Sequence, residues 1–247
     1  MSKVISVVSG KGGVGKTTFS INLAAALYEF EQESIIVDAD ICNPNIALYL
    51  GLSHMPLTIQ DVLNDNADIN HAIQIHPTGL KIVPADISMD RSSADFSRLK
   101  EVLTDLEDLI IVDSPPGLND DIKAIMDASD KIIVVTNPEV PAVTDAVKTI
   151  RAAKDRGKHD IGVVINRVKN NSYELTTDEV EIMCEAPILA TISEDENIRK
   201  SLFENLILIH RNPYSHASID FRYLAARLLK MQYIPPRFLF LRRILNR

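Results

Sequence analysis

The sequence has few cysteines and no long apolar run, and each of these absences excludes a class of protein. Its two cysteines, Cys42 and Cys184, lie far apart and form no C-x-x-C pair. This argues against a disulfide framework or a metal cluster and fits a reduced, cytoplasmic setting. No apolar run approaches the roughly 18 residues that a membrane-spanning helix needs. The first apolar run is too short for a signal peptide, so we expect none.

Basic residues are scarce relative to acidic ones. The 247 residues carry a formal net charge of −8, which argues against non-specific binding of nucleic acid. Hydrophobic residues make up 46% of the chain and charged residues 24%, as in ordinary soluble domains. We therefore expect one globular domain over residues 1–234, followed by a short separate segment at 235–247 that begins with Pro235-Pro236.

Short apolar runs alternate with helical patterns along the domain. The runs are rich in Ile and Val and show little alternation with polar residues, which is typical of strands covered by helices on both faces. The sequence thus predicts an α/β fold with a mainly parallel central sheet and helices on both faces. The predicted strands are 4–9, 34–38, 80–84, 109–113, 131–136, 161–166 and 188–192, and the predicted helices are 16–30, 94–106, 141–156, 176–184 and 218–230.

A glycine-rich segment follows the first predicted strand. Residues 9–18 read Ser-Gly-Lys-Gly-Gly-Val-Gly-Lys-Thr-Thr and satisfy the P-loop pattern G-x-x-x-x-G-K-[ST]. Glycines let several backbone N–H groups point at phosphate oxygens, and the next helix adds its positive dipole end. Lys16 can reach the β- and γ-phosphates, and the Thr17 hydroxyl can bind Mg²⁺. A glycine-rich turn without a ligand is the alternative. The nucleotide-binding residues expected here are Gly10, Lys11, Gly12, Gly13, Val14, Gly15, Lys16, Thr17 and Thr18.

Aspartates stand where two predicted strands end. Asp38 and Asp40 lie at the end of one strand, and Asp113 ends another in the form of a Walker B motif. Ligands of open α/β sheets bind at this carboxyl edge. One of the first two carboxylates can contribute to the Mg²⁺ shell while the other polarises an attacking water; a solvated acidic turn is the alternative. Asp113 is positioned for Mg²⁺ through water.

Lys11 is a second lysine inside the loop, directly after its first glycine. Joined to Asp40 and Asp113, this pattern resembles the MinD/ParA family of deviant Walker A ATPases. The resemblance to its MinD-type members covers nearly the whole chain. It implies that the chain hydrolyses ATP with Mg²⁺, that Lys11 reaches the phosphates of the other subunit in an ATP-bound homodimer, and that Asp40 orients the attacking water. Lys11, Lys16 and Asp40 are then the catalytic residues, and Thr17, Asp40 and Asp113 surround the metal.

Selection of the base is predicted from the strand that ends in Asn166. An asparagine amide can donate to and accept from the edge of adenine, and a helix cap or turn is the alternative role. The resemblance implies that Asn166 contacts the purine. The N/T-K-x-D signature typical of guanine-specific P-loop proteins is absent from the sequence. Residues Ser193-Glu194-Asp195 differ from the family's Ile-Pro-Glu-Asp by having serine in place of proline. The difference affects the expected shape of the loop over the base.

The carboxyl end is basic and apolar. The last 17 residues contain four arginines and no acid, so the rest of the chain carries −12 against −8 for the whole. A helix over 237–247 would be about 16 Å long, too short to span a bilayer but able to lie in its interface. This resembles the membrane-targeting helix of MinD; packing on the core or on a protein is the alternative. One face of this helix would carry Phe238, Phe240, Leu241, Ile244 and Leu245. The other face would carry Arg242, Arg243, Asn246 and Arg247, and Leu239 would lie on neither face.

Together these features predict a MinD-type switch that is cytoplasmic and bound peripherally to the membrane. Its ATP-bound dimer would hold the anionic membrane surface through residues 237–247 and position or inhibit cell-division or other polar machinery. The regulator or cargo protein is not identified by the sequence. A ParA-like DNA-partitioning ATPase is the alternative, disfavoured by the acidic body, and an Mrp-type iron–sulfur carrier is disfavoured by the missing C-x-x-C.

Overall fold

The protein is described by a computed structural model that covers residues 4–86 and 94–245. Its centre is an eight-stranded sheet in the order β3-β4-β2-β5-β1-β6-β7-β8. All neighbouring strands are parallel except the edge pair of β3 and β4. This confirms the predicted α/β fold. The strands are β1 (Val4–Val8), β2 (Ser34–Asp38), β3 (Gln74–Ile75), β4 (Lys81–Val83), β5 (Leu109–Asp113), β6 (Lys131–Thr136), β7 (Ile161–Val168) and β8 (Ile188–Ser193).

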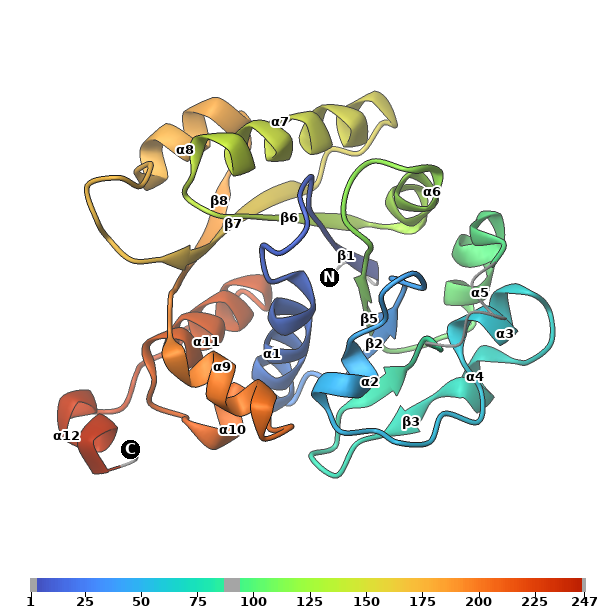
Figure 1. Cartoon of the computed structure of the whole chain (residues 1–247), viewed down its shortest axis with the longest axis horizontal. Helices are drawn as coiled ribbons and strands as arrows, with labels where there is room; N and C mark the ends of the chain where they lie inside the picture. Colours follow the sequence, from blue (N-terminus) through green and yellow to red (C-terminus); the bar gives the residue numbers. More distant parts are fainter. Residues whose placement is uncertain (1–3, 87–93, 246–247) are drawn as a thin grey trace.

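Helices cover both faces of the sheet, as Figure 1 shows. Strand side chains alternate between two apolar layers; in β1, Val4 and Val8 face one layer while Ile5 and Val7 face the other. The first layer is completed by α3 (Ile59–Leu63), α4 (Ile69–Ala72), α5 (Leu99–Thr104), α6 (Asp120–Ala128), α7 (Val140–Asp155) and α8 (Thr177–Cys184). The second is completed by α1 (Lys16–Glu29), α2 (Ile46–Tyr49), α10 (Leu208–Arg211) and α11 (His216–Leu228).

Helix α1 lies at the centre of the second layer. The sequence predicts one inward face formed by Ile21, Leu23, Ala24, Ala26 and Leu27, but the structure buries every residue from Phe19 to Leu27. The reason is that the sheet covers one side of α1 and α11 covers the other. The rings of Phe19 and Phe221 join the two helices with centroids 5.7 Å apart. Across the same contact, the largely buried Arg222 guanidinium donates to Glu29, with Nη2–Oε1 at 2.8 Å.

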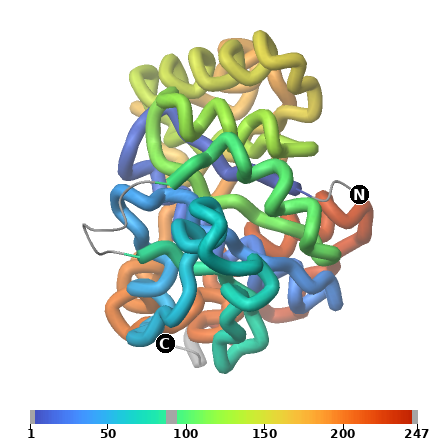
Figure 2. Tube along the Cα trace, turned by 90° about the vertical axis from the view of Figure 1, so that its right-hand side faces the viewer, coloured from blue at the N-terminus to red at the C-terminus, as the bar shows by residue number. Residues whose placement is uncertain are grey.

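Three C-terminal helices lie at the end of the molecule opposite α7 and α8. Figures 1 and 2 agree in placing α9 (Glu196–Phe203) and α10 there, near the C-terminal helix α12 (Leu239–Leu245). Pro235 and Pro236 precede α12 and belong to no helix or strand. Within residues 4–86 and 94–245, no helix is long and apolar enough to cross a membrane.

Helix α12 packs on the protein through its arginines. Arg242 donates from Nη1 to the Tyr214 hydroxyl at 3.0 Å, and its guanidinium lies over the Tyr214 ring, 5.2 Å from the centroid. Arg243 donates to the Tyr214 carbonyl oxygen at 2.7 Å and to Nε2 of His216 at 2.7 Å. The apolar side chains of Phe238, Phe240 and Leu241 are exposed. The predicted positions of the Ile244 and Leu245 side chains, and of Asn246 and Arg247, lie outside the described residues.

Candidate nucleotide site

The glycine-rich loop connects the end of β1 to the first residue of α1, as predicted. Gly15 is the N-cap of α1 and has φ +95°, and Gly13 has φ +78°, both in the region that side chains disfavour. Close contacts also require glycine. A Cβ on Gly15 would lie 2.7 Å from Asn166 Nδ2, and one on Gly10 would lie 2.4 Å from the Asp145 carbonyl oxygen in α7. The loop is therefore held between α7 and β7, with its concave side left open.

Lys16 is buried at the start of α1 without an ion-pair partner among the described residues. Its ammonium donates to the Ser9 hydroxyl at 2.8 Å, and that hydroxyl donates to the Lys11 carbonyl oxygen at 2.8 Å. Burial lowers the pKa of Lys16, while the charges of Asp113 and Asp40 act in the opposite direction. An ammonium that is desolvated in this way is suited to bind an anion.

Asp113 ends β5 and is completely buried. Its Oδ2 accepts a hydrogen bond from the Thr17 hydroxyl at 2.6 Å, and its Oδ1 accepts one from the Ser20 hydroxyl at 2.9 Å. Burial raises its pKa to about 6, against the lowering effects of the two hydroxyls and of Lys16. A hydroxyl and a carboxylate in contact, both oxygen donors, form a set that Mg²⁺ prefers, so these residues fit the metal.

The two aspartates after β2 occupy different environments. Asp40 borders the cavity described below, and its Oδ1 accepts the Asn43 N–H at 3.1 Å. Burial raises its pKa, opposed by that N–H and by Lys16. Asp38 lies deeper, in register with Asp113 on β5, and accepts the N–H groups of Asp40 and Ile46 at 3.2 Å each. It does not line the cavity. Asp40 is thus the carboxylate that can meet a water molecule there.

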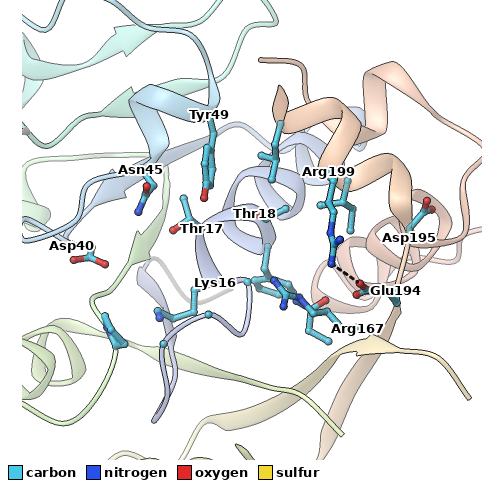
Figure 3. A pocket seen from close by; sticks show the side chains of 18 of the residues that line it. Lys16, Thr17, Thr18, Asp40, Asn45, Tyr49, Arg167, Glu194, Asp195 and Arg199 are labelled. Atoms are coloured by element: carbon cyan, nitrogen blue, oxygen red, sulfur yellow. Dashed lines mark ion pairs between the residues drawn. The ribbon is translucent and has the colours of Figure 1, made fainter. Parts of the chain in front are cut away.

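These groups border a cavity of about 340 Å³ at the carboxyl edge of the sheet. Figure 3 shows Lys16, Thr17 and Asp40 on one side of it and Arg167, Glu194 and Arg199 on the other, where an ion pair joins the last two. Of the residues predicted from the sequence, it brings together Gly12, Gly13, Gly15, Lys16, Thr17, Thr18, Asp40 and Asn166. Gly10, Lys11, Val14 and Asp113 do not line it.

Asn166 is nearly buried next to the loop. Its Nδ2 donates to the Val14 carbonyl oxygen at 2.8 Å, while its Oδ1 has no hydrogen bond to another described residue. Arg167 follows in a left-handed conformation at φ +61° and borders the cavity. Lys11 is exposed, and its ammonium has no hydrogen-bond or ion-pair partner within residues 4–86 and 94–245.

Several cavity residues are missed by the sequence interpretation. Arg199 comes from α9, which is not among the predicted helices, and Tyr49 comes from the four-residue helix α2. The start of α9 is signalled by Asp195, whose side chain caps it by accepting the Asn197 N–H at 3.0 Å. Asn43 and Asn45, in the segment between β2 and α2, also border the cavity.

Comparison with known proteins agrees with this geometry. Residues 1–228 match a family model described as the ParA family, NUBPL iron-transfer P-loop NTPase. An uncharacterized ATP-binding protein of Methanocaldococcus jannaschii is 38% identical over 237 residues, which are 94% of this chain and 90% of that protein.

Two solved structures are similar along nearly their whole length. The cell division ATPase MinD of Pyrococcus furiosus is 32% identical with a TM-score of 0.87, covering 93% of this chain and 99% of that one. The septum site-determining protein MinD of Pyrococcus horikoshii, complexed with Mg-ADP, is 32% identical with a TM-score of 0.86, covering 92% and 96%. The chain therefore belongs to the MinD/ParA family of P-loop ATPases.

Proposed function

We propose that this chain is a MinD-type molecular switch that hydrolyses ATP in the presence of Mg²⁺. The observation that carries the proposal is the convergence of Lys16, Thr17 and Asp40 on one cavity, with Asp113 directly behind Thr17. The backbone N–H groups of the loop and the Lys16 ammonium bind the β- and γ-phosphates. Thr17, Asp113 and Asp40 would hold Mg²⁺, and the ion would neutralise the phosphate charge.

Hydrolysis requires one water molecule to be held in line with the γ-phosphate. Asp40 accepts a hydrogen bond from that water and turns its lone pair toward phosphorus. The new P–O bond forms as the bond between γ-phosphorus and the β–γ bridging oxygen breaks, and ADP leaves. Because Lys16 is buried, its charge acts on the departing oxygen in a medium of low polarity, where the interaction is strong.

Replacement of Asp40 tests this mechanism. In Asp40→Asn, ATP binding should persist, because Lys16 and the loop are unchanged, while turnover falls by at least about tenfold. Asp160→Asn, which breaks a surface pair with Lys131, is the matched control and should keep normal turnover. Turnover at the wild-type rate in Asp40→Asn would remove Asp40 from the reaction.

We further propose that adenine is selected through Asn166. Nδ2 donates one of its two hydrogens to the Val14 carbonyl oxygen, which fixes the orientation of the amide. Oδ1 can then accept from the adenine amino group and the second Nδ2 hydrogen can be donated to a ring nitrogen, a pattern that the carbonyl and N–H of guanine do not match. Competition of GTP against a bound fluorescent ATP analogue should require much more GTP than ATP. Equal competition by the two nucleotides would contradict this role.

We propose that ATP joins two copies of the chain through Lys11. Its support is that the Lys11 ammonium is exposed beside the loop and unpaired among the described residues, as a contact to a second subunit requires. Light scattering should detect an ATP-dependent dimer in the wild type and in Lys123→Ala, an exposed lysine on α6, but a monomer in Lys11→Ala. An ATP-dependent dimer in Lys11→Ala would refute the role.

We propose that residues 235–247 form a separate segment that binds anionic membranes from the cytoplasmic side. Phe240 and Leu241 on α12 and Phe238 just before it are exposed. Each arginine near an anionic surface contributes about 1 kcal/mol. One copy binds weakly, whereas two copies in a dimer gain by avidity. Vesicles with anionic lipid should sediment the full chain with ATP and Mg²⁺, but not with ADP, and not a chain truncated after Pro236.

The other family functions have less support. Binding to DNA but not to vesicles would favour a ParA-like role. The family model's name includes iron transfer, but the described residues contain no group of three or more His, Cys, Asp or Glu that could hold a metal. We infer that the partner of the membrane-bound dimer is a protein of the cell-division or another polar assembly, as the name of the Pyrococcus furiosus relative suggests.

A further inference from the structure

The hydrogen bonding of Asp113 involves a residue that the proposed mechanism does not use. Two hydroxyls from α1 hold this carboxylate, one on each oxygen: Thr17 on Oδ2 at 2.6 Å and Ser20 on Oδ1 at 2.9 Å. The two residues are three positions apart in a helix, so their side chains lie on one face and meet the end of β5 together. A carboxylate held at both oxygens cannot rotate about its Cβ–Cγ bond.

The two hydroxyls have different access to the cavity. Thr17 borders it, whereas Ser20 is completely buried behind it and does not line it. A hydroxyl has one hydrogen and two lone pairs. While the Thr17 hydrogen stays on Asp113 Oδ2, the Thr17 lone pairs remain free for a cation in the cavity. The orientation of the carboxylate therefore determines the direction in which the Thr17 oxygen presents its lone pairs.

Ser20 has a choice of acceptors. Its hydroxyl lies 2.9 Å from Asp113 Oδ1 and 3.1 Å from the Lys16 carbonyl oxygen, one turn earlier in the helix. The carboxylate is the nearer acceptor and a bond to an ionised group is about twice as strong as a neutral one, so the hydrogen belongs on Asp113. The bond joins residues 93 positions apart and ties the start of α1 to the end of β5.

We propose that Ser20 is a positioning residue of the Mg²⁺ site: by fixing the plane of the Asp113 carboxylate, it orients the Thr17 hydroxyl and the outer oxygen shell of the metal. The inference rests on the proposed Mg²⁺-dependent binding of ATP and assigns to that site a residue that touches neither metal nor nucleotide. Partners of this kind affect metal affinity about 10- to 100-fold when they are replaced.

The test compares Mg²⁺ dependence with Mg²⁺-free binding in the full chain. A fluorescent ATP analogue is titrated with Mg²⁺ to obtain the half-saturating concentration, and its affinity is measured separately in EDTA. Ser20→Ala should raise the half-saturating Mg²⁺ concentration about 10- to 100-fold. Its affinity in EDTA should change by less than about threefold, because Lys16 and the loop supply that binding.

Two further variants separate positioning from packing. Ser20→Cys keeps the shape of the side chain but offers a weak donor, so its Mg²⁺ requirement should lie between those of serine and alanine. Ser218→Ala is the matched control: Ser218 is also buried in a helix, on α11, and donates to the Asn212 carbonyl oxygen at 2.8 Å. It should keep the wild-type Mg²⁺ requirement although it loses a comparable hydrogen bond.

The possible outcomes are distinct. An unchanged Mg²⁺ requirement in Ser20→Ala, or in Ser20→Cys if the alanine variant does not fold, overturns the positioning role. So does a parallel loss of affinity with Mg²⁺ and in EDTA, because that pattern indicates disturbed packing. If the wild type binds the analogue without any Mg²⁺ dependence, the proposed function itself fails, and the Ser20 inference falls with it for that separate reason.

Discussion

Glycine at position 15 is required by two separate physical effects, and the chain allows them to be measured apart. Gly15 and Gly117 have nearly equal φ angles, +95° and +94°. A Cβ on Gly117 would have no neighbour within 4 Å, whereas one on Gly15 would collide with Asn166 Nδ2. Alanine at either position is strained by the backbone angle, at a cost of about 1–2 kcal/mol.

We expect Gly15→Ala to be the more destabilising of the two, by about 1 kcal/mol or more, because Asn166 must leave the Val14 carbonyl and that acceptor loses its hydrogen bond. Urea unfolding of both variants gives the difference. ATP affinity should also fall strongly in Gly15→Ala. Equal losses of stability would show that Asn166 moves aside without penalty.

Asp113 makes the stability of the nucleotide-free protein depend on pH. Its pKa is about 6 in the folded chain, above its ordinary value of 3.8, because it is buried. A pKa raised by folding means that the folded state binds the proton more tightly, so this contribution to stability is present below about pH 4 and is lost as pH rises through 6. The ionised carboxylate thus destabilises the free protein at neutral pH, and a cation in the site offsets this.

Asp113→Asn should therefore be more stable than the wild type at pH 7.5 in EDTA, by about 2 kcal/mol. The difference should shrink as the pH is lowered toward 4, since the wild-type carboxyl then becomes neutral. Urea unfolding at several pH values measures both quantities. A difference that does not vary with pH would mean that another property of the substitution, such as its packing, accounts for it.

Sequence reasoning identifies the candidate site residues that belong to a recognisable local pattern. Lys16 and Thr17 are fixed by the P-loop spacing, and Asp40 and Asp113 by the ends of apolar strands. It misses Ser20 and Arg199, which carry no local signal. The proposed role of Ser20 depends on an aspartate 93 positions away, and Arg199 borders the cavity because of where α9 lies. Such contacts depend on the order of strands in the sheet, which cannot be read from local patterns in the sequence.

Among the elements, buried strands are the best predicted. The bounds of β2, β5 and β6 coincide with the predictions, because long Ile and Val runs suit strands covered on both faces. The two-residue strand β3 is missed, as are the helices α6 and α9. Predicted helix 94–106 begins instead with a 3₁₀ turn at Phe96–Arg98, where the Asp95 side chain accepts the Ser97 N–H. Short elements take their structure from caps and packing more than from periodicity.

Helix α12 is too short to be stable alone in water, so its contacts with Tyr214 and His216 hold it in place. Replacing Arg242 and Arg243 by alanine removes these contacts. We expect chymotrypsin to cleave at Phe238 or Phe240 several times faster in the double variant. Arg237→Ala is the control: it should leave cleavage unchanged, because the substitution keeps the backbone carbonyl that accepts from Arg242. Unchanged cleavage in the double variant would mean that the arginines do not retain the helix.

The same contacts set a condition for the proposed membrane binding. An arginine that donates to Tyr214 cannot also bind a lipid phosphate with the same N–H groups, so α12 must leave its place beside Tyr214 and His216 before both its arginines reach a membrane. The double variant should therefore release α12 and also lose vesicle binding. The two effects are measured separately, although both come from Arg242 and Arg243. This relation exists because Arg242 and Arg243 contact the protein while Phe238, Phe240 and Leu241 stay exposed.

At the scale of the whole molecule, the site lies at the centre of the fold. Its loop leaves β1, which pairs with both β5 and β6, and its other walls come from the segment after β2, from the end of β7 and from α9. A ligand bound there contacts elements from both halves of the sheet. Because these walls exist only in the folded chain, binding stabilises the whole domain by mass action.

We therefore expect ATP with Mg²⁺, at about 1,000 times its dissociation constant, to stabilise the protein by about 4 kcal/mol. For a chain of this size that corresponds to a rise in Tm of roughly 8–16 °C, measurable by calorimetry. ATP in EDTA should give a smaller rise, because the charge of Asp113 then stays unneutralised next to the phosphates. Lys16→Ala should fold, because the loop retains its backbone N–H groups. Its Tm should rise little with ATP, because the loop has lost the cation that binds the phosphates. A full shift in Lys16→Ala would place the bound nucleotide elsewhere, and the cavity at the end of β1 would then not be the site through which ATP acts on the fold.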